Sequence, residues 1–171
     1  MFRPQFFILN IMVIKKMTIS KAQKKQIGLI VKIHKDCIHK TNAKFYDAKI
    51  IKEWFKQISQ KNVLEQFQNT SWYVIKFSNK IIGFCQFSLK EKILYQINIS
   101  PHFQSKGAGE ILYNFIEKKF IKNKKEKILL NSTLNAEKFY KKLGFKKIKS
   151  IKFKLNEQSI KMIKMAKNLS D

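Results

Sequence analysis

Gln104-Ser105-Lys106-Gly107-Ala108-Gly109 is the stretch around which the rest of the chain is organised. It follows an apolar run at 93–99 that predicts a strand and stops at Ser100-Pro101, and it precedes a periodic stretch at 110–122 that predicts a helix. A glycine-containing turn between a strand and a helix presents unpaired backbone N–H groups at the positive end of the helix dipole. The stretch therefore predicts an anion site, most naturally one for phosphate.

Glycine is also needed at such a turn for geometry alone. A chain that bends from a strand into a helix uses residues without a Cβ atom whether or not it binds a ligand. The six residues by themselves are therefore a weak signal, and both interpretations stay open until the rest of the chain is considered.

The residues on either side of the turn predict a mixed α/β domain. Apolar residues recur at a spacing of two in the expected strands and of three or four in the expected helices. Ser20 is the expected N-cap of the first helix, and Ile148, Ile151 and Phe153 are expected to be buried. We expect strands at 11–17, 72–77, 81–89, 93–99, 128–130, 145–155 and 160–165, and helices at 20–38, 47–59, 110–122 and 135–143. The order β-α-α-β-β-β-α-β-α-β-β predicts a central mixed sheet of about seven strands.

Length and composition indicate one globular domain. A chain of 171 residues with 44% hydrophobic and 13% aromatic residues can bury a hydrophobic core without disulfides or structural metals. We interpret 1–10 as an apolar N-terminal leader, or as the start of the first strand, and 11–171 as a single domain. Pro4 and Asn10 interrupt the apolar residues at the beginning, and the run is too short to span a bilayer, so we expect no membrane association.

Cys37 and Cys85 are the two cysteines of the chain. They lie far apart in the sequence and form no Cys-x-x-Cys pair, so neither a disulfide framework nor a zinc cluster is expected. The pattern predicts a cytoplasmic protein without a bound metal.

The charge balance is strongly basic, with 36 Lys and Arg against 11 Asp and Glu and a net charge of +25. Such a surface attracts anions, and nucleic acid is one partner that it fits. The basic residues are nearly all lysines, however, and they are spread along the chain, whereas nucleic-acid recognition relies heavily on arginine. We favour a compositional bias over a nucleic-acid site, and the choice stays open.

A second motif, Ala136-Glu137-Lys138-Phe139-Tyr140-Lys141-Lys142-Leu143-Gly144-Phe145, is much more specific than the first. Together with the Asn- and Ser-rich turn before it, this run resembles the Ala-x-x-Phe-Tyr-x-x-x-Gly-Phe signature of the GNAT superfamily of N-acetyltransferases. Gln104 to Gly109 is similar to the pyrophosphate motif of that family, and Ile97 to Pro101 is similar to the end of its fourth strand. The resemblance covers nearly the whole chain, from about Ile11 to the last strand.

The resemblance implies acetyl-coenzyme A as the donor and a primary amine as the acceptor. In this family the fourth and fifth strands separate at a bulge, and the pantetheine arm lies between them while the pyrophosphate meets the glycine turn. Relatives are commonly dimers, so a homodimer is one expectation. The implied cofactor-binding residues are Ile97, Ile99, Gln104, Ser105, Lys106, Gly107, Ala108, Gly109, Glu110 and Asn135.

The resemblance also implies two catalytic groups. The backbone N–H of Ile99 would face the thioester oxygen and stabilise the oxyanion. Tyr140 matches the tyrosine that protonates the departing thiolate in many relatives, for which a phenol is a suitable acid. Packing beside Phe139 is the alternative role for Tyr140.

The general base is open, because Ile93 stands where many relatives carry a carboxylate on the fourth strand. His34, His102 and Glu91 are the remaining candidates, and a water chain to bulk solvent is another solution. For the acceptor pocket we expect His34, Tyr46 and Tyr95, with Trp54 assigned to the core.

Three functions fit these observations. The leading hypothesis is an N-acetyltransferase that acts directly on a primary amine of a small molecule, peptide or protein. The second is a catalytically weak module of the same fold that binds a polyanion such as RNA. The third is an acetyltransferase whose acceptor is the amine of an aminoacyl-tRNA.

Overall fold

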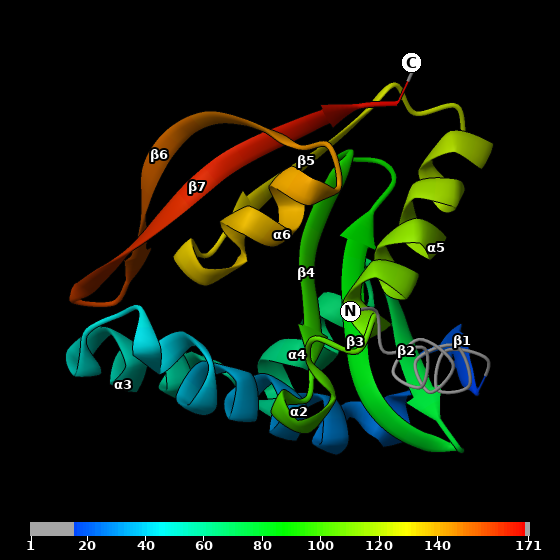
Figure 1. Cartoon of the computed structure of the whole chain (residues 1–171). Coiled ribbons are helices and arrows are strands. Elements are labelled where there is room, and N and C mark those ends of the chain that lie inside the picture. Colours follow the sequence, from blue (N-terminus) through cyan, green and yellow to red (C-terminus); the bar gives the residue numbers. More distant parts are fainter. Residues whose placement is uncertain (1–15, 170–171) are drawn as a thin grey trace, which may run out of the picture.

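The computed structural model describes residues 16–169, which form a seven-stranded sheet with helices on both faces (Figure 1). The strands lie in the order β1-β2-β3-β4-β5-β7-β6. The predicted class, a mixed sheet of about seven strands, is confirmed.

The first four strands form an antiparallel unit that follows from the alternating β-branched and aromatic residues of this part of the chain. They are β1 (Met17–Lys21), β2 (Ser71–Phe77), β3 (Lys80–Ser88) and β4 (Ile93–Ile99). Ser78 and Asn79, with φ of 47° and 66°, make the tight turn from β2 to β3, in the left-handed conformation that such hairpin turns require.

The other three strands join this unit along a short stretch of β4. They are β5 (Lys127–Ser132), β6 (Lys146–Leu155) and β7 (Gln158–Asn168). β5 runs parallel to β4, and the ladder between them contains the single residue pair Ile93 and Leu129. β5 continues as an antiparallel partner of β7, so beyond Ile93 the two halves of the sheet separate.

Two apolar cores lie on opposite faces of the sheet. α5 (Ala108–Lys122) and α6 (Glu137–Lys142) cover one face, where the core includes Leu112, Ile116, Phe120, Tyr140 and Met165. α2 (Ile27–Lys40) and α4 (Gln60–Phe67) cover the other face, where the core includes Ile30, Ile33, Val63, Trp72 and Phe84. α3 (Ala48–Gln57) extends from α2 toward β6 and β7 (Figure 1).

The N-terminal prediction was wrong in its boundaries. Met17 begins the first strand, which ends at Lys21, and the helix begins at Ile27 after a short 3-10 turn. Ser20 lies inside β1 opposite Val74, so pairing with β2 overrides its capping preference. The predicted strand residues 11–15 and the leader at 1–10 lie outside the described residues.

α4 was missed, although its start carries a local signal. Ser59 is its N-cap and accepts a hydrogen bond from the backbone N–H of Asn62 across 3.1 Å. The prediction that Ile148 and Phe153 are buried was also wrong, because each is 52% exposed. They lie on β6, the edge strand of the sheet, and the register shift between Lys147 and Lys149 leaves Ile148 unpaired.

None of the helices within residues 16–169 is both long enough and apolar enough to serve as a membrane span.

Candidate active site

β4 carries one extra residue at the place where it separates from β5. Gln86 of β3 pairs with Gln96, but its neighbour Phe87 pairs with Leu94, so Tyr95 has no partner in the ladder. This is a β-bulge, which bends the bulged strand and locally ends regular pairing. The bulge turns the second half of β4 away from β5 and opens the gap between the two strands.

The backbone of β4 directs hydrogen-bonding groups into this gap. Along an antiparallel pair, residues alternate between those bonded to the partner strand and those whose N–H and C=O point to the other side. Ser100 donates its N–H to the carbonyl of Ile82 across 2.8 Å, so Ser100 is a bonded position. Ile99 and Ile97, one and three residues earlier, therefore point their backbone polar groups away from β3.

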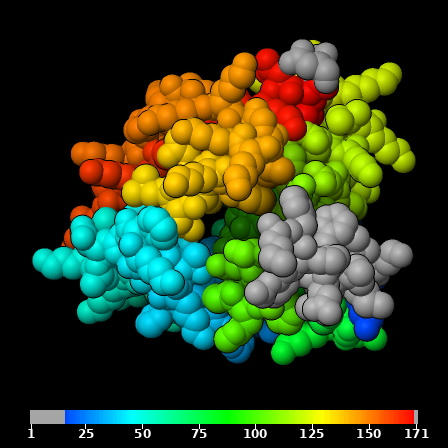
Figure 2. Space-filling view, in the orientation of Figure 1, coloured from blue at the N-terminus to red at the C-terminus, as the bar shows by residue number. Residues whose placement is uncertain are grey.

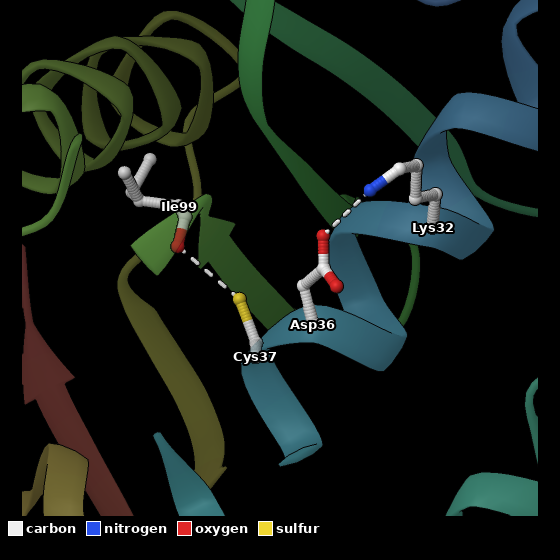
Figure 3. A network of polar contacts seen from close by, with 4 residues as sticks. All are labelled: Lys32, Asp36, Cys37 and Ile99. Atoms are coloured by element: carbon white, nitrogen blue, oxygen red, sulfur yellow. Dashed lines mark hydrogen bonds and ion pairs between the residues drawn. The ribbon is translucent and has the colours of Figure 1, made fainter. Parts of the chain in front are cut away.

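The carbonyl of Ile99 is tied down by two side chains. The side-chain amide of Gln104 donates to it across 2.8 Å, and the Cys37 thiol of α2 donates to it across 3.1 Å (Figure 3). Gln104 also exchanges hydrogen bonds with the hydroxyl of Thr41, at 3.1 and 3.2 Å. The side chain of Gln104 thus faces inward and joins the end of β4 to α2.

Cys37 remains a thiol in this position. Burial, reinforced by the charge of Asp36, raises its pKa to about 12. Asp36 itself is paired with Lys32 across 3.1 Å, on the neighbouring turn of α2, and this ion pair points away from Ile99 (Figure 3).

The turn after Gln104 has the geometry of an anion cradle. Ser105 and Gly107 are left-handed, with φ of 60° and 83°, and α5 begins at Ala108. None of the backbone N–H groups of 105–110 donates a hydrogen bond to another described residue; the first helical bond runs from Ile111 to Gly107. A Cβ atom on Gly109 would lie 3.3 Å from the ring of Phe139. The Lys106 ammonium folds back onto the carbonyl of His102 across 3.0 Å.

The second motif supplies the opposite wall of the gap. Tyr140 on α6 is buried, and its ring packs edge-on against Phe139 and Phe145 with centroids 5.1 and 5.6 Å away. Burial raises the pKa of its phenol, which is therefore protonated at neutral pH. The side-chain oxygen of Asn135 is buried without a hydrogen-bond partner among the described residues, so it has a free acceptor for a ligand.

Between these walls lies a cavity of about 140 Å³ that brings half of the predicted residues together. It is lined by His34, Cys37, Thr41, Tyr95, Ile97, Asn98, Ile99, Gln104, Asn135 and Tyr140, among others. The residues of 105–110 do not line it; they follow directly after Gln104. Figure 2 shows a hollow between the yellow atoms of the α6 side and the cyan and blue atoms of α2 and α3.

A second cavity of about 570 Å³ adjoins the first. The residues that line both are His34, Trp54, Tyr95, Gln96, Asn131 and Met162. Trp54, which the sequence assigned to the core, therefore also borders the cavities. The larger cavity extends from this junction toward α4 and β6.

Two titratable residues stand at the junction of the cavities. His34 is half-buried against Phe84, and burial lowers its pKa to about 4, so its imidazole is neutral at neutral pH. Tyr95 donates its hydroxyl to Glu91, and burial together with that carboxylate raises its pKa to about 12. His102, the third candidate base, is exposed in the turn that follows β4.

Tyr46 lies outside both cavities. Its hydroxyl donates to the carbonyl of Lys161 on β7 across 2.9 Å and accepts the N–H of Leu134 across 2.8 Å. Tyr46 therefore ties the connection between α2 and α3 to the far half of the sheet.

Sequence reasoning missed the contact of Cys37 with Ile99 at the end of β4 and the contact of Thr41 with Gln104 in the turn that follows. Each joins residues more than sixty positions apart, and no motif marks either side chain. Within residues 16–169, no three His, Cys, Asp or Glu side chains come together as a metal site would require.

Solved structures with this fold include several acetyltransferases. A GCN5-related N-acetyltransferase from Rhodopseudomonas palustris matches with a TM-score of 0.84 and 13% identity, covering 88% of this chain and 94% of that one. PaiA N-acetyltransferase from Thermoplasma acidophilum, in complex with coenzyme A, matches with a TM-score of 0.72 and 17% identity, covering 89% of this chain and 98% of that one. YncA from Salmonella typhimurium, with acetyl-CoA, matches with a TM-score of 0.65 and 18% identity, covering 91% of this chain and 95% of that one.

A comparison with curated protein sequences gave no significant match. A family model described as an acetyltransferase (GNAT) domain matches residues 41–169, a range that contains both motifs and most of the chain. The glycine turn at the start of α5, the bulged β4 and the Tyr140 signature lie within this range. The chain belongs to the GNAT family of acetyltransferases.

Proposed function

We propose that this enzyme transfers the acetyl group of acetyl-CoA directly to a primary amine. The amine nitrogen forms a bond to the acetyl carbon, and the bond from that carbon to sulfur breaks. The amine loses one proton, the thiolate of coenzyme A gains one, and no covalent enzyme intermediate is needed.

The single observation that carries the proposal is the continuity between the anion cradle and the gap beside β4. The free N–H groups of 105–110 suit a pyrophosphate at the N-terminus of α5. Gln104, which begins the same turn, lines the cavity that contains Tyr140 and Asn135. The residues present therefore fit coenzyme A, with its anionic end at the turn and its thioester end in the gap.

The backbone N–H of Ile99 is the proposed donor to the oxyanion that develops on the thioester oxygen. A pre-aimed donor at such a place stabilises the transition state without reorganisation. The hydrogen bonds from Gln104 and Cys37 to the carbonyl of Ile99 support this role, because they hold that residue in one position.

Tyr140 is the proposed acid that protonates the departing thiolate. Its pKa is raised by burial, so it carries its proton at neutral pH. It lines the same cavity as Ile99 and Asn135, and this supports a proton donor and an oxyanion donor that act in one space.

His34 is the proposed proton acceptor for the attacking amine. Of the three candidates it alone borders both cavities, and its imidazole is neutral. Glu91 could receive the proton only indirectly, through Tyr95. The hydroxyl of Tyr95, at the junction of the cavities, donates a hydrogen bond to Glu91.

Release of free thiol from acetyl-CoA in the presence of a panel of amines tests the proposed function. We expect thiol release that requires an amine and is matched mole for mole by the acetylated product. Folded protein that releases no thiol with any amine but binds RNA in a salt-dependent way would instead support the polyanion-binding alternative. An aminoacyl-tRNA in the panel tests the third hypothesis.

A further inference from the structure

The two adjoining cavities stand apart from the rest of the surface in their charge. Among residues 16–169, neither cavity is lined by Lys, Arg, Asp or Glu. Three other hollows of the surface each contain lysines, such as Lys52, Lys35 and Lys161. In a chain with a net charge of +25, two contiguous cavities without a charged side chain are a distinctive feature.

Amide and aromatic side chains take the place of charges in the larger cavity. Six of the lining residues carry side-chain amides: Gln57, Asn62, Gln66, Gln96, Asn131 and Asn156. Trp54, Tyr95 and Phe153 add aromatic surface, and His34 is neutral there. Amides both donate and accept hydrogen bonds, so they suit hydroxyl and amide groups of a ligand, while the rings suit an apolar face.

One row of amides, of which Asn98, Gln96 and Gln66 line the cavities, is internally connected. Asn98 donates to Gln96 across 2.8 Å, Gln96 donates to Gln86 across 2.7 Å, and Gln86 donates to Gln66 across 3.1 Å. Each amide donates one of its two N–H groups to the next side chain in the row. Asn98 lines the smaller cavity, and with its amide nitrogen bonded to Gln96 its side-chain oxygen can serve as an acceptor for an N–H group of a substrate.

A polycation finds no counter-charge in this site. A second ammonium inside the cavity would need a carboxylate, since an unpaired buried charge is costly. Two carboxylates contact lining residues without lining the cavities themselves. Glu53 accepts from Asn156 across 3.2 Å and is already paired with Lys56 across 2.6 Å, and Glu91 accepts the hydroxyl hydrogen of Tyr95. The excess of lysine elsewhere on the chain repels cations as well.

The geometry points to an acceptor whose primary amine is carried on an uncharged body that has hydroxyl or amide groups on one side and an apolar face on the other. This inference rests on the proposed function and narrows its substrate class. An amino sugar and an amino-acid amide share this chemistry, whereas polyamines and simple alkylamines lack it.

Steady-state acetylation of four amines tests the substrate class: glucosamine, alaninamide, spermidine and butylamine. We expect kcat/KM for glucosamine or alaninamide to exceed that for both spermidine and butylamine by at least about tenfold, because only the first two can pair with the amides. A higher kcat/KM for glucosamine than for alaninamide would indicate that hydroxyl groups are recognised, and the reverse order would indicate amide groups. A higher kcat/KM for spermidine or butylamine than for both would overturn the inference.

Gln57→Glu is the matched variant, because Gln57 lines the larger cavity and its replacement adds one carboxylate of nearly the same shape. We expect it to lower KM for spermidine about tenfold and to leave KM for butylamine nearly unchanged. Gln68→Glu makes the same change on the exposed end of α4, outside both cavities, and should alter neither value. An equal effect of the two variants would contradict a neutral acceptor site.

Binding of the acetylated products provides a readout that does not depend on turnover. In calorimetry with coenzyme A present, N-acetylglucosamine or N-acetylalaninamide should bind at least about tenfold more tightly than N-acetylspermidine. Absence of thiol release with every amine would refute the proposed function. Tightest binding of N-acetylspermidine would refute the substrate class alone.

Discussion

The side-chain amide of Gln104 donates a hydrogen bond to the carbonyl oxygen of Ile99 across 2.8 Å. The contact joins the first residue of the glycine turn to the last residue of β4. It therefore couples the part of the site that suits a pyrophosphate to the part that suits a thioester. In the family motif this residue is counted with the phosphate loop, but its side chain here supports the strand.

Gln104→Ala should lower both stability and turnover. The change removes the bond to a partly buried carbonyl, which costs about 1–2 kcal/mol in the free energy of unfolding. It should also lower kcat more than it weakens coenzyme A binding, because the side chain faces the strand and not the turn. Urea denaturation, kcat and the Kd for coenzyme A measure the three effects. A large loss of coenzyme A affinity at unchanged kcat would place the side chain on the ligand instead.

Tyr140→Phe should lower kcat by about a hundredfold, because the departing thiolate would lose its proposed proton donor. The Kd for coenzyme A should stay nearly unchanged, since the ring and its packing remain. The measurement is single-turnover acetyl transfer, which reports chemistry apart from product release.

Tyr113→Phe is the control for that variant. Tyr113 packs against Phe145 with the same 5.6 Å centroid distance as Tyr140, but its hydroxyl donates to Glu117. It should keep wild-type kcat. Equal kcat losses in the two variants would indicate an effect of packing and not of proton donation.

Gly83→Ala should destabilise the protein and impair turnover together. A Cβ atom on Gly83 would lie 2.7 Å from the backbone carbonyl of Asn98 and 2.5 Å from the side chain of Ile99. Overpacking of this kind costs about 1–3 kcal/mol and would displace the end of β4. Thermal unfolding and kcat measure both consequences.

Gly28→Ala is the counterpart inside a helix. The nearest atom to its new Cβ is the side-chain nitrogen of Gln60, 3.7 Å away, so α2 has room for the methyl group. The free energy of unfolding should rise by about 0.5–1 kcal/mol, because alanine is a better helix former than glycine, and kcat should be unchanged. Destabilisation by both alanines, to a similar degree, would show that crowding at β4 is not the cause.

His34 should make stability depend on pH below neutrality. Its pKa is lowered from 6.5 to about 4 in the folded state, so between those values the unfolded chain binds more protons than the folded one. The free energy of unfolding therefore rises with pH across this window. It decreases again as the pH falls, by at most about 3 kcal/mol. Urea denaturation from pH 4 to pH 7, compared with His34→Gln, isolates the contribution. A parallel pH dependence of the two proteins would rule out a buried neutral imidazole.

Local patterns predicted the elements around the proposed site well. The strand at β4, the turn at Gly107 and the signature around Tyr140 are each contained in a few consecutive residues, and their spacing reflects backbone requirements. The number of strands and their order along the chain followed from the same patterns, whereas the position of β7 between β5 and β6 in the sheet did not.

Contacts between distant segments could not be predicted in the same way. Tyr46 and Lys161 are 115 positions apart, and Cys37 and Ile99 are 62 apart, so nothing local marks either pair. The exposure of Phe153 depends on which elements cover β6, and an apolar residue on an edge strand looks the same in the sequence as one in the core. Tyr46 consequently lies beside the site and not inside the cavities.

The most direct test of the proposed site is the change in backbone amide resonances when ¹⁵N-labelled protein is titrated with coenzyme A. We predict saturable shifts at 105–110, where the N–H groups are free, and at Ile97 and Ile99, whose backbone faces the gap. The backbone amide resonances of β6 should not shift. Saturable shifts confined to other surfaces, with 105–110 and Ile99 unchanged, would contradict the assignment of this turn and this strand to the donor.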